Sequence, residues 1–356
     1  MRLLICAGGT GGGVYPALTV TEKLDKNQHQ VLWVGSESGM EADLVARTGL
    51  QFKAIQAAGL HGVSLSKLPG NLAKLIRGYQ QSRKILEEFQ PDVLLFTGGY
   101  VAIPMALAGS KFKSLLYVPD IEPGLALKTL ARFSDHIALT TPESKKWFSE
   151  KKNMTITGYP LRDDIKKWAK SEAQTYFKLE PNLPTILFVG GSSGARSINQ
   201  AVLSILDQLL EKYQVIHLTG HLDWETIQAA TVNAGDRYHP FPYLHEIGAA
   251  MAAADLAVSR AGASTLGEYP YFGLPAILVP YPYAWRYQKV NADYLVDRGA
   301  AVLLRDEELK SDLLTMINDL MANPAYLAHM SRAMSALSQP MAAERISELL
   351  YEMTEA

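Results

Sequence analysis

Glycine-rich stretches carry the residues of this sequence that are most suited to chemistry. The first, CAGGTGGGVYP (6–16), directly follows a short apolar run. Glycine permits positive φ and lets backbone N–H groups approach a ligand without a side-chain clash. A helix starting near Pro16 would add the positive end of its dipole, and proline suits a first helical turn. These features predict a site for a phosphate or diphosphate, with a plain tight turn as the alternative.

Two further stretches repeat this pattern. In GGSSGARSIN (190–199), the Ser192 hydroxyl and the amides after it suit an anion, and Arg196 lies in the first helical turn. The alternative is a helix that Ser192 or Ser193 merely caps. In SRAGASTLGE (259–268), small residues precede Glu268, which is placed to accept two hydrogen bonds from a ribose diol. The alternative for Glu268 is an exposed helix charge.

Short apolar runs that alternate with helical patterns must position these loops. In the first half the runs are Leu3–Cys6, Val31–Val34, Val93–Phe96, Leu115–Val118 and Ile137–Leu139. A second series comprises PTILFVGG (184–191), Val215–Leu218, Leu256–Val258, Ala276–Val279 and Ala301–Leu303. Buried strands alternating with helices indicate parallel sheets with helices on both faces.

The predicted fold class is therefore α/β, with two doubly wound parallel-sheet (Rossmann-like) domains facing a cleft. Both series open with a strand, glycines and a helix, and 356 residues exceed a usual single core. TGYPLRDDI (157–165) marks the crossover. We expect an N-terminal domain at 1–162, a C-terminal domain at 163–339, and a helix at 340–356 packing back on the first domain. Ligands should bind at the carboxyl ends of the strands.

Composition excludes several classes of protein. The net charge of −2 gives no basic field that would hold nucleic acid, so no nucleic-acid partner is expected. Cys6 is the only cysteine, which excludes an internal disulfide and a cysteine-based metal cluster. The eight histidines are scattered without HExxH spacing, so no metal is expected. No run of about 18 apolar residues occurs, which predicts a soluble or peripheral protein.

Taken together and in order, the three loops resemble one family. GGTGG-x-VYPAL, GGSSGARSIN, SRAGASTLGE and the following GLPAILVPYPYAWRYQKVNA (273–292) are similar to the MurG family of peptidoglycan synthesis, from about residue 2 to residue 350. The resemblance implies a GT-B fold and an inverting, metal-independent and cofactor-free hexosyltransferase. Such an enzyme moves N-acetylglucosamine (GlcNAc) from UDP-GlcNAc to lipid I, undecaprenyl-diphospho-N-acetylmuramoyl-pentapeptide, giving lipid II. It acts at the cytoplasmic face of the bacterial membrane.

The resemblance also implies roles for single residues. Ser192 would touch the donor phosphate, Arg162 would steady the leaving UDP, and Leu244 would contact uracil through its backbone. Glu268 would bind the ribose, and Gln288 the donor sugar, with Tyr287 replacing a second glutamine of the family. The remaining implied positions are Ala263, Ser264 and Thr265 beside the donor, and Thr10, Gly11, Gly12, Gly13 and Tyr100 beside the acceptor diphosphate.

Departures from the family fall on the acceptor side. The family's glycine loop usually ends in histidine, the favoured general base, and Gly13 stands there. In YVPDIEPGLALK (117–128), where the family reads close to HEQNxxPGxxN, Tyr117 replaces the histidine and Asp120 the asparagine. Inverting transfer needs a base, which commonly contributes about 10²–10⁴-fold. Asp120 is the preferred candidate, followed by Glu122 and then His61. A different acceptor geometry or a weakened enzyme is the alternative.

Residues 61–86 form a basic segment without carboxylates. Lys67, Lys74, Arg77, Arg83 and Lys84 alternate with leucines, Ile76 and Tyr79 that can share one surface. Such a segment suits a protein lying on an anionic membrane surface. An ordinary helix that packs on the sheet and has a solvated basic face is the alternative.

Other functions remain compatible with the sequence. The enzyme alternatives are a GT-B transferase with another lipid-linked acceptor, such as a different polyprenyl diphosphate sugar or a diacylglycerol lipid. The missing histidine would also fit a UDP-sugar-binding subunit lacking its own base. A nicotinamide-dependent oxidoreductase rests on the weak glycine fingerprint, with Glu37 at the end of the second strand.

Overall fold

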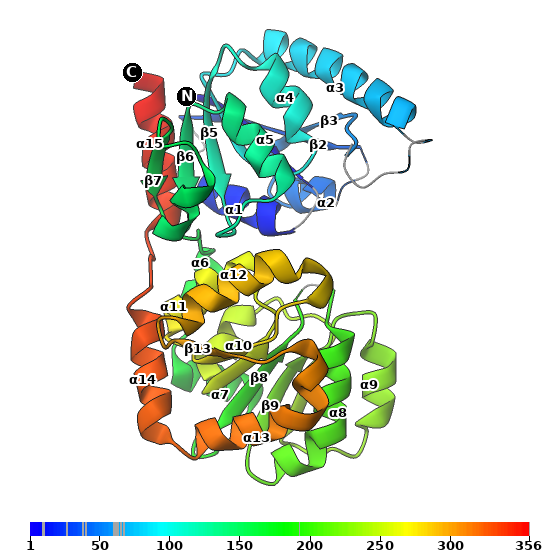
Figure 1. Cartoon of the computed structure of the whole chain (residues 1–356), viewed down its shortest axis with the longest axis vertical. Helices are drawn as coiled ribbons and strands as arrows, with labels where there is room; N and C mark the ends of the chain where they lie inside the picture. The colour runs from blue at the N-terminus through cyan, green and yellow to red at the C-terminus, as the bar shows by residue number, and fades with distance from the viewer. Residues whose placement is uncertain are drawn as a thin grey trace. The chain divides into compact units, whose positions relative to one another are not determined.

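The chain divides into two compact units. The computed structural model describes residues 1–8, 11–25, 28–37, 39, 41–59, 64, 66, 68–191 and 193–355, with the backbone alone at 284–286. Unit 1 comprises Met1–Pro160 and Pro340–Ala356, and unit 2 comprises Leu161–Gln339 (Figure 1). The boundary predicted from the sequence, after residue 162, puts Arg162 in the first unit, whereas the structure assigns Arg162 to unit 2.

Unit 1 is built on a parallel sheet. Among the described residues it has seven strands, which in sheet order are β3 (Gln51–Ile55), β2 (Gln30–Ser36), β1 (Arg2–Ala7), β4 (Val93–Gly98), β5 (Lys113–Val118), β6 (His136–Leu139) and β7 (Asn153–Ile156). Its helices are α1 (Gly11–Glu22), α2 (Glu41–Ala46), α3 (Leu68–Phe89), α4 (Ala102–Ala108), α5 (Leu125–Phe133) and α15 (Ala342–Glu355), with the 3₁₀ helix η2 (Pro142–Trp147).

Alternating residues of β1 serve two separate cores. Leu3 and Ile5 pack with residues of α1 and α15 on one face. Leu4 and Cys6 pack with residues of α3, α4 and α5 on the other. A strand covered on both faces must be apolar throughout, which is why the sequence shows an unbroken apolar run here.

Unit 2 repeats the plan with its own sheet. Its strands, six among the described residues, are in sheet order β10 (Tyr238–Phe241), β9 (Gln214–Leu218), β8 (Thr185–Val189), β11 (Leu256–Ser259), β12 (Ala276–Leu278) and β13 (Ala301–Leu303). Its helices are α6 (Asp163–Lys166), α7 (Lys170–Phe177), α8 (Arg196–Leu210), α9 (Trp224–Ala230), α10 (Ile247–Ala253), α11 (Glu268–Phe272), α12 (Trp285–Val296), α13 (Leu309–Met321) and α14 (Pro324–Ser335), with 3₁₀ helices η3 (Ala263–Leu266), η4 (Pro282–Ala284) and η5 (Asp306–Glu308).

Helices α8 and α13 cover one face of this second sheet. Apolar residues of both helices share a core with Ile186 and Phe188 of β8. On the other face, α10 contacts β8 and buries three alanines, Ala249, Ala250 and Ala253. Every strand pair formed by the described residues of either unit is parallel. The predicted α/β class with two doubly wound parallel sheets is therefore confirmed.

The strand order of each sheet reverses at one point. In unit 1 this point lies between β1 and β4, and in unit 2 between β8 and β11. Connections leave in opposite directions there, which opens a crevice at the carboxyl edge where open α/β sheets bind ligands. The glycine stretches after β1 and β8 both start at this point.

The C-terminal helix α15 belongs to unit 1. Tyr351 Oη lies 2.9 Å from His29 Nε2, and Lys23 Nζ lies 3.1 Å from Glu344 Oε1. Ile346 and Leu350 are fully buried against the sheet and α1. Helix α15 and strand β1, from opposite ends of the sequence, therefore pack in the same core. Across the residues described, no helix is long and apolar enough to cross a membrane.

Leu350→Ala is expected to destabilise unit 1 by about 2–5 kcal/mol, because it leaves a cavity under α15. Thermal unfolding of the purified variant measures this loss. Glu348→Ala, on the exposed face of the same helix, serves as the control and should change stability by less than about 0.5 kcal/mol. Equal effects of the two substitutions would contradict the packing of α15.

Candidate functional site

The glycine loop after β8 lies directly against the loop after β9. Gly194 has φ of +79° and Gly220 has φ of +76°. A Cβ at Gly194 would overlap the Thr219 carbonyl oxygen, and one at Gly220 would overlap the backbone of Gly194. Only glycine fits both positions, so this edge of unit 2 presents backbone before α8 begins at Arg196. Ser192 lies outside the described residues.

A chain of hydrogen bonds that is buried at Asn199 supports this loop. Asn199 of α8 donates from Nδ2 to the Thr219 carbonyl at 2.8 Å and to Asp223 Oδ2 at 2.9 Å. Asp223 Oδ1 in turn accepts from Arg196 Nε at 3.0 Å. The first turn of α8 is therefore tied to the β9 loop by charge-assisted hydrogen bonds.

His217 completes this chain inside the core. Its Nε2 lies 2.9 Å from Asn199 Oδ1, and its Nδ1 lies 2.8 Å from the Tyr238 hydroxyl. An amide oxygen only accepts, so Nε2 carries the proton and Nδ1 accepts from Tyr238. Burial lowers the pKa of His217 to about 3 and keeps the ring neutral. The sequence alone does not predict a role for His217, because its partners Asn199 and Tyr238 are distant along the chain.

A second, partly buried cluster joins three loops of the same edge. Arg260, which follows β11, donates from Nη2 to Ser197 Oγ at 2.7 Å and from Nη1 to the Val279 carbonyl at 3.1 Å. Its Nη1 also lies 2.5 Å from Asp306 Oδ1. Ser197 Oγ donates to the same Asp306 oxygen at 2.7 Å. The ion pair thus fixes the ends of β11 and β12 relative to α8.

Glu268 begins α11 beside two polar neighbours. Burial raises the pKa of its carboxyl, while a hydrogen bond from Ser264 and the positive charge of Arg162 act in the opposite direction. Arg162 Nη1 also lies 3.4 Å from Asp164 Oδ2. The structure therefore brings Arg162, Ser264 and Glu268 together within unit 2. Ala263 and Thr265 are buried beside them in η3.

Leu244 and Gln288 lie on the connections that follow β10 and β12, at the same carboxyl edge of the sheet. Leu244 is buried in the loop after β10. Gln288 Oε1 accepts the Tyr281 backbone N–H at 2.8 Å, which ties α12 to the connection after β12. Buried Asn291 of α12 donates to the Ala261 carbonyl at 3.2 Å. Polar side chains of α12 thus hold two of the loops around η3.

The glycine loop of unit 1 ends in helix α1, which begins at Gly11 rather than near Pro16. Pro16 lies inside the helix, and the expected start was wrong because three glycines before it already adopt helical backbone. The hydroxyl of Thr97 on β4 donates to the Gly13 carbonyl and anchors this first turn. Gly11, Gly12 and Gly13 therefore supply the first-turn N–H groups that a helix leaves unpaired. Thr10 lies outside the described residues.

The turn after β4 lies beside this loop. Gly99 has φ of +86°, and a Cβ there would overlap the Gly8 carbonyl oxygen. Tyr100 follows, 44% exposed, with its ring 3.2 Å from the position of a Cβ on Gly59. The first turn of α1 and Tyr100 therefore lie at one edge of unit 1.

The two carboxylates after β5 have different surroundings. Asp120 is partly exposed. The Glu122 side chain is 3% exposed, and its Oε1 accepts from Lys128 Nζ at 3.4 Å. Tyr117 is buried with its hydroxyl 2.8 Å from Thr140 Oγ1, and burial raises its pKa above the ordinary tyrosine range. His61 lies outside the described residues.

Comparison with known proteins identifies the family. The N-terminal domain of glycosyltransferase family 28 matches residues 3–139, and its C-terminal domain matches residues 185–346. A UDP-N-acetylglucosamine--N-acetylmuramyl-(pentapeptide) pyrophosphoryl-undecaprenol N-acetylglucosamine transferase of Desulforamulus reducens is 37% identical, covering 98% of this chain and 97% of its own. The enzyme of the same name from Halalkalibacterium halodurans is 36% identical, with 99% of both chains covered. This chain belongs to the MurG family.

Solved structures agree with that assignment. MurG of Acinetobacter baumannii superposes with a TM-score of 0.79 and 25% identity over 99% of both chains. A UDP-GlcNAc 2-epimerase of Neisseria meningitidis, solved with UDP-GlcNAc, has a TM-score of 0.70 at 16% identity and shares the fold alone. The MurG resemblance and the GT-B fold inferred from the sequence are confirmed.

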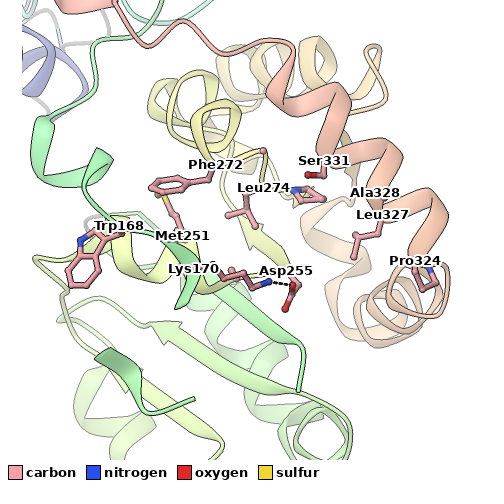
Figure 2. A pocket seen from close by; sticks show the side chains of 14 residues that line it. Trp168, Lys170, Met251, Asp255, Phe272, Leu274, Pro324, Leu327, Ala328 and Ser331 are labelled. Atoms are coloured by element: carbon pink, nitrogen blue, oxygen red, sulfur yellow. Dashed lines mark hydrogen bonds and ion pairs between the residues drawn. The ribbon is translucent and has the colours of Figure 1, made fainter. Parts of the chain in front are cut away.

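The MurG-family loops of unit 2 lie at the edge of its sheet opposite the pocket of Figure 2. That pocket, of about 440 Å³, lies where β8, β11 and β12 begin, between α10 and α14. Trp168, Met251 and Phe272 line it, and an ion pair joins Lys170 to Asp255 at its floor (Figure 2). The donor residues implied by the resemblance do not line this pocket.

The neutral state of His217 makes the stability of this MurG-family protein depend on pH. In the unfolded chain the ring gains a proton near pH 6.5, whereas the folded ring stays neutral down to about pH 3. The unfolded state therefore binds more protons below pH 6.5, and the stability contribution is lost as pH falls. Between pH 7.5 and 5.5 the loss should be about 1.4 kcal/mol.

Urea unfolding at the two pH values measures this change. His217→Gln should reduce the loss by about that amount, while the exposed His221→Gln should leave it unchanged. An identical pH dependence in wild type and His217→Gln would refute the neutral buried ring.

Proposed function

We propose that this chain is an inverting glycosyltransferase that moves GlcNAc from UDP-GlcNAc onto undecaprenyl-diphospho-N-acetylmuramoyl-pentapeptide. The names of its curated relatives support this acceptor over other lipid-linked acceptors. The single structural observation in favour is the pair of bare-backbone loops, after β1 and β8, at the point where each sheet reverses. Two such loops suit a reaction between two diphosphate substrates.

Unit 2 is proposed to bind UDP-GlcNAc. The amides at the start of α8, with Ser192, would hold the donor diphosphate, and the loop containing Leu244 would contact uracil. Glu268 would accept hydrogen bonds from the ribose. Burial raises the pKa of its carboxyl, and the hydrogen bond from Ser264 and the positive charge of Arg162 act against this shift. The remaining proposed donor contacts are Ala263, Ser264, Thr265 and Gln288.

Unit 1 is proposed to bind the acceptor diphosphate. The first-turn amides of Gly11, Gly12 and Gly13 lack side chains, so phosphate oxygens can approach them closely. The exposed Tyr100 would contribute its hydroxyl, and Thr10 would complete the loop. A diphosphate carries enough negative charge to profit from the positive end of α1.

Asp120 is proposed as the general base. Its carboxylate would take the proton of the acceptor hydroxyl as that oxygen bonds to the anomeric carbon. The bond from that carbon to the donor phosphate breaks at the same time, and UDP leaves with the electron pair, stabilised by Arg162 and the α8 amides. The partial exposure of Asp120 favours it over Glu122, which is buried against Lys128.

Helix α3 is proposed to meet the anionic membrane that carries the acceptor. Leu72 is 52% exposed and Ile76 is 53% exposed, on the side of α3 away from the buried Gly78 and Ser82. Apolar side chains flanked by lysine and arginine suit an amphipathic helix lying in a lipid interface. Of the predicted segment, residues 61–63, 65 and 67 lie outside the described part of the chain.

A turnover assay tests the function and the base together. Wild type, UDP-GlcNAc and a short-chain lipid I analogue should give UDP and the GlcNAc-bearing product, with UDP release depending on the analogue. Asp120→Asn should lower kcat by about 10²–10⁴-fold. No product from wild type would refute the acceptor, and full kcat in Asp120→Asn would refute the base.

Two further variants control this prediction. Glu122→Gln should retain kcat within about fivefold if the carboxylate only pairs with Lys128. Gly13→His, added to Asp120→Asn, should recover part of the lost rate by restoring an imidazole at the family's position. A Cβ at Gly13 would lie 3.2 Å from the Thr97 carbonyl oxygen, so this substitution requires the backbone there to move by a few tenths of an ångström.

The double variant Leu72→Ser, Ile76→Ser should bind vesicles containing anionic lipid about tenfold more weakly than wild type. It removes apolar area that would be buried in the lipid on binding. Co-sedimentation with vesicles of phosphatidylglycerol and phosphatidylcholine measures this change. Gln80→Ser, an exposed change elsewhere on α3, should bind as wild type does. Unchanged binding of the double variant would exclude α3 as the lipid-facing surface.

A further inference from the structure

Glu41 is a buried carboxylate at the carboxyl edge of unit 1 with no role in the steps above. It is the first residue of α2, and its side chain is fully buried. Its Oε1 accepts the backbone N–H and the hydroxyl of Ser36, both at 2.7 Å. Ser36 is the last residue of β2, so the carboxylate is held at the end of the strand beside β1.

Three glycines from separate segments make room for this one side chain. A Cβ on Gly35 of β2 would lie 2.7 Å from Glu41 Cγ. A Cβ on Gly39 or on Gly8 would overlap the carboxylate itself. Gly8 is the first residue of the glycine loop after β1, so the carboxylate lies directly against the base of that loop.

A carboxylate in this position is costly unless it is held by hydrogen bonds. Burying an ionised group costs several kcal/mol without such partners, and an apolar side chain of the same size would avoid that cost. The carboxylate also affects Cys6 on β1: burial raises the pKa of the Cys6 thiol, and the negative charge of Glu41 raises it further. Packing alone therefore does not explain why a glutamate occupies this space.

We propose that Glu41 is a positioning residue that fixes the start of the glycine loop against the end of β2, so that the first-turn amides of α1 face the acceptor diphosphate. This inference rests on the proposed function of unit 1. Ser36 sets the direction of the carboxylate, and the carboxylate sets the position of Gly8. Gly99, directly after β4, approaches Gly8 so closely that a Cβ on it would overlap the Gly8 carbonyl oxygen. The loop start is therefore bounded from the ends of both neighbouring strands.

Glu41→Ala should raise the KM for the short-chain lipid I analogue about tenfold or more, because misplaced amides bind the diphosphate poorly. The KM for UDP-GlcNAc should stay within about twofold, since that substrate is assigned to unit 2. Val45→Ala is the matched control: Val45 is fully buried on the same helix but packs into the apolar core. Equal acceptor KM values in the two variants would overturn the proposal.

Two milder variants keep the test decisive if Glu41→Ala does not fold. Glu41→Gln retains an oxygen that can accept both Ser36 donors and should keep an acceptor KM near that of wild type. Ser36→Ala removes one of the two hydrogen bonds and should raise the acceptor KM about threefold. An unchanged acceptor KM in Ser36→Ala would overturn the proposal. So would a tenfold rise of the acceptor KM in Glu41→Gln that is matched by an equal rise of the KM for UDP-GlcNAc.

Hydrogen exchange separates a failure of this inference from a failure of the proposed function. Amides at 15, 17 and 18, which pair with carbonyls in the first turn of α1, should exchange about tenfold faster in Glu41→Ala than in Val45→Ala, whatever the acceptor is. Equal exchange in the two variants would refute the positioning role even in an active enzyme. If Glu41→Ala exchanges faster but the wild type transfers no sugar to the analogue, the positioning role stands and the proposed acceptor is refuted.

Discussion

Backbone amides at the reversal point of a parallel sheet are the constraint on which both units depend. The strands flanking this point send their connections in opposite directions, so the N–H groups that start the next helix have no neighbouring strand to pair with. They are available to an anion only if no side chain covers them. Gly194 packed against Gly220, and Gly99 packed against Gly8, satisfy this requirement in units 2 and 1. Substrate chemistry at these edges follows from that bare backbone.

A loop of glycines has little intrinsic rigidity, so its position must come from groups beneath it. In unit 2 the hydrogen bonds run from the β9 loop through Asn199 to His217, and a second ion pair joins Arg260 to Asp306. In unit 1 the supports are the Thr97 hydroxyl and the Glu41 carboxylate. Asn199, His217, Thr97 and Glu41 are buried on strands or helices, which restricts their rotamers. Flexible backbone is thereby made to present a single arrangement to the ligand.

The sequence predicted the parts of the fold that local patterns encode. Leu3–Cys6 and 184–191 were recognised as strands because both of their faces are buried, which leaves an unbroken apolar run. β3, β7 and β10 were missed because they lie at or near sheet edges, where polar residues are tolerated. Glu41 and Asp306 could not be predicted, since their partners are brought close only by the fold. The sequence does not identify the general base, because Gly13 stands where the family usually has the histidine that serves as the base.

The assignment of the two substrates to the two units is the central claim, and a crystal structure of the protein with UDP-GlcNAc tests it most directly. The account predicts the uracil at the loop containing Leu244, the ribose at Glu268 and the diphosphate at the start of α8. Nucleotide bound instead against Gly11, Gly12 and Gly13 would contradict it, because the loop assigned to the acceptor would then belong to the donor.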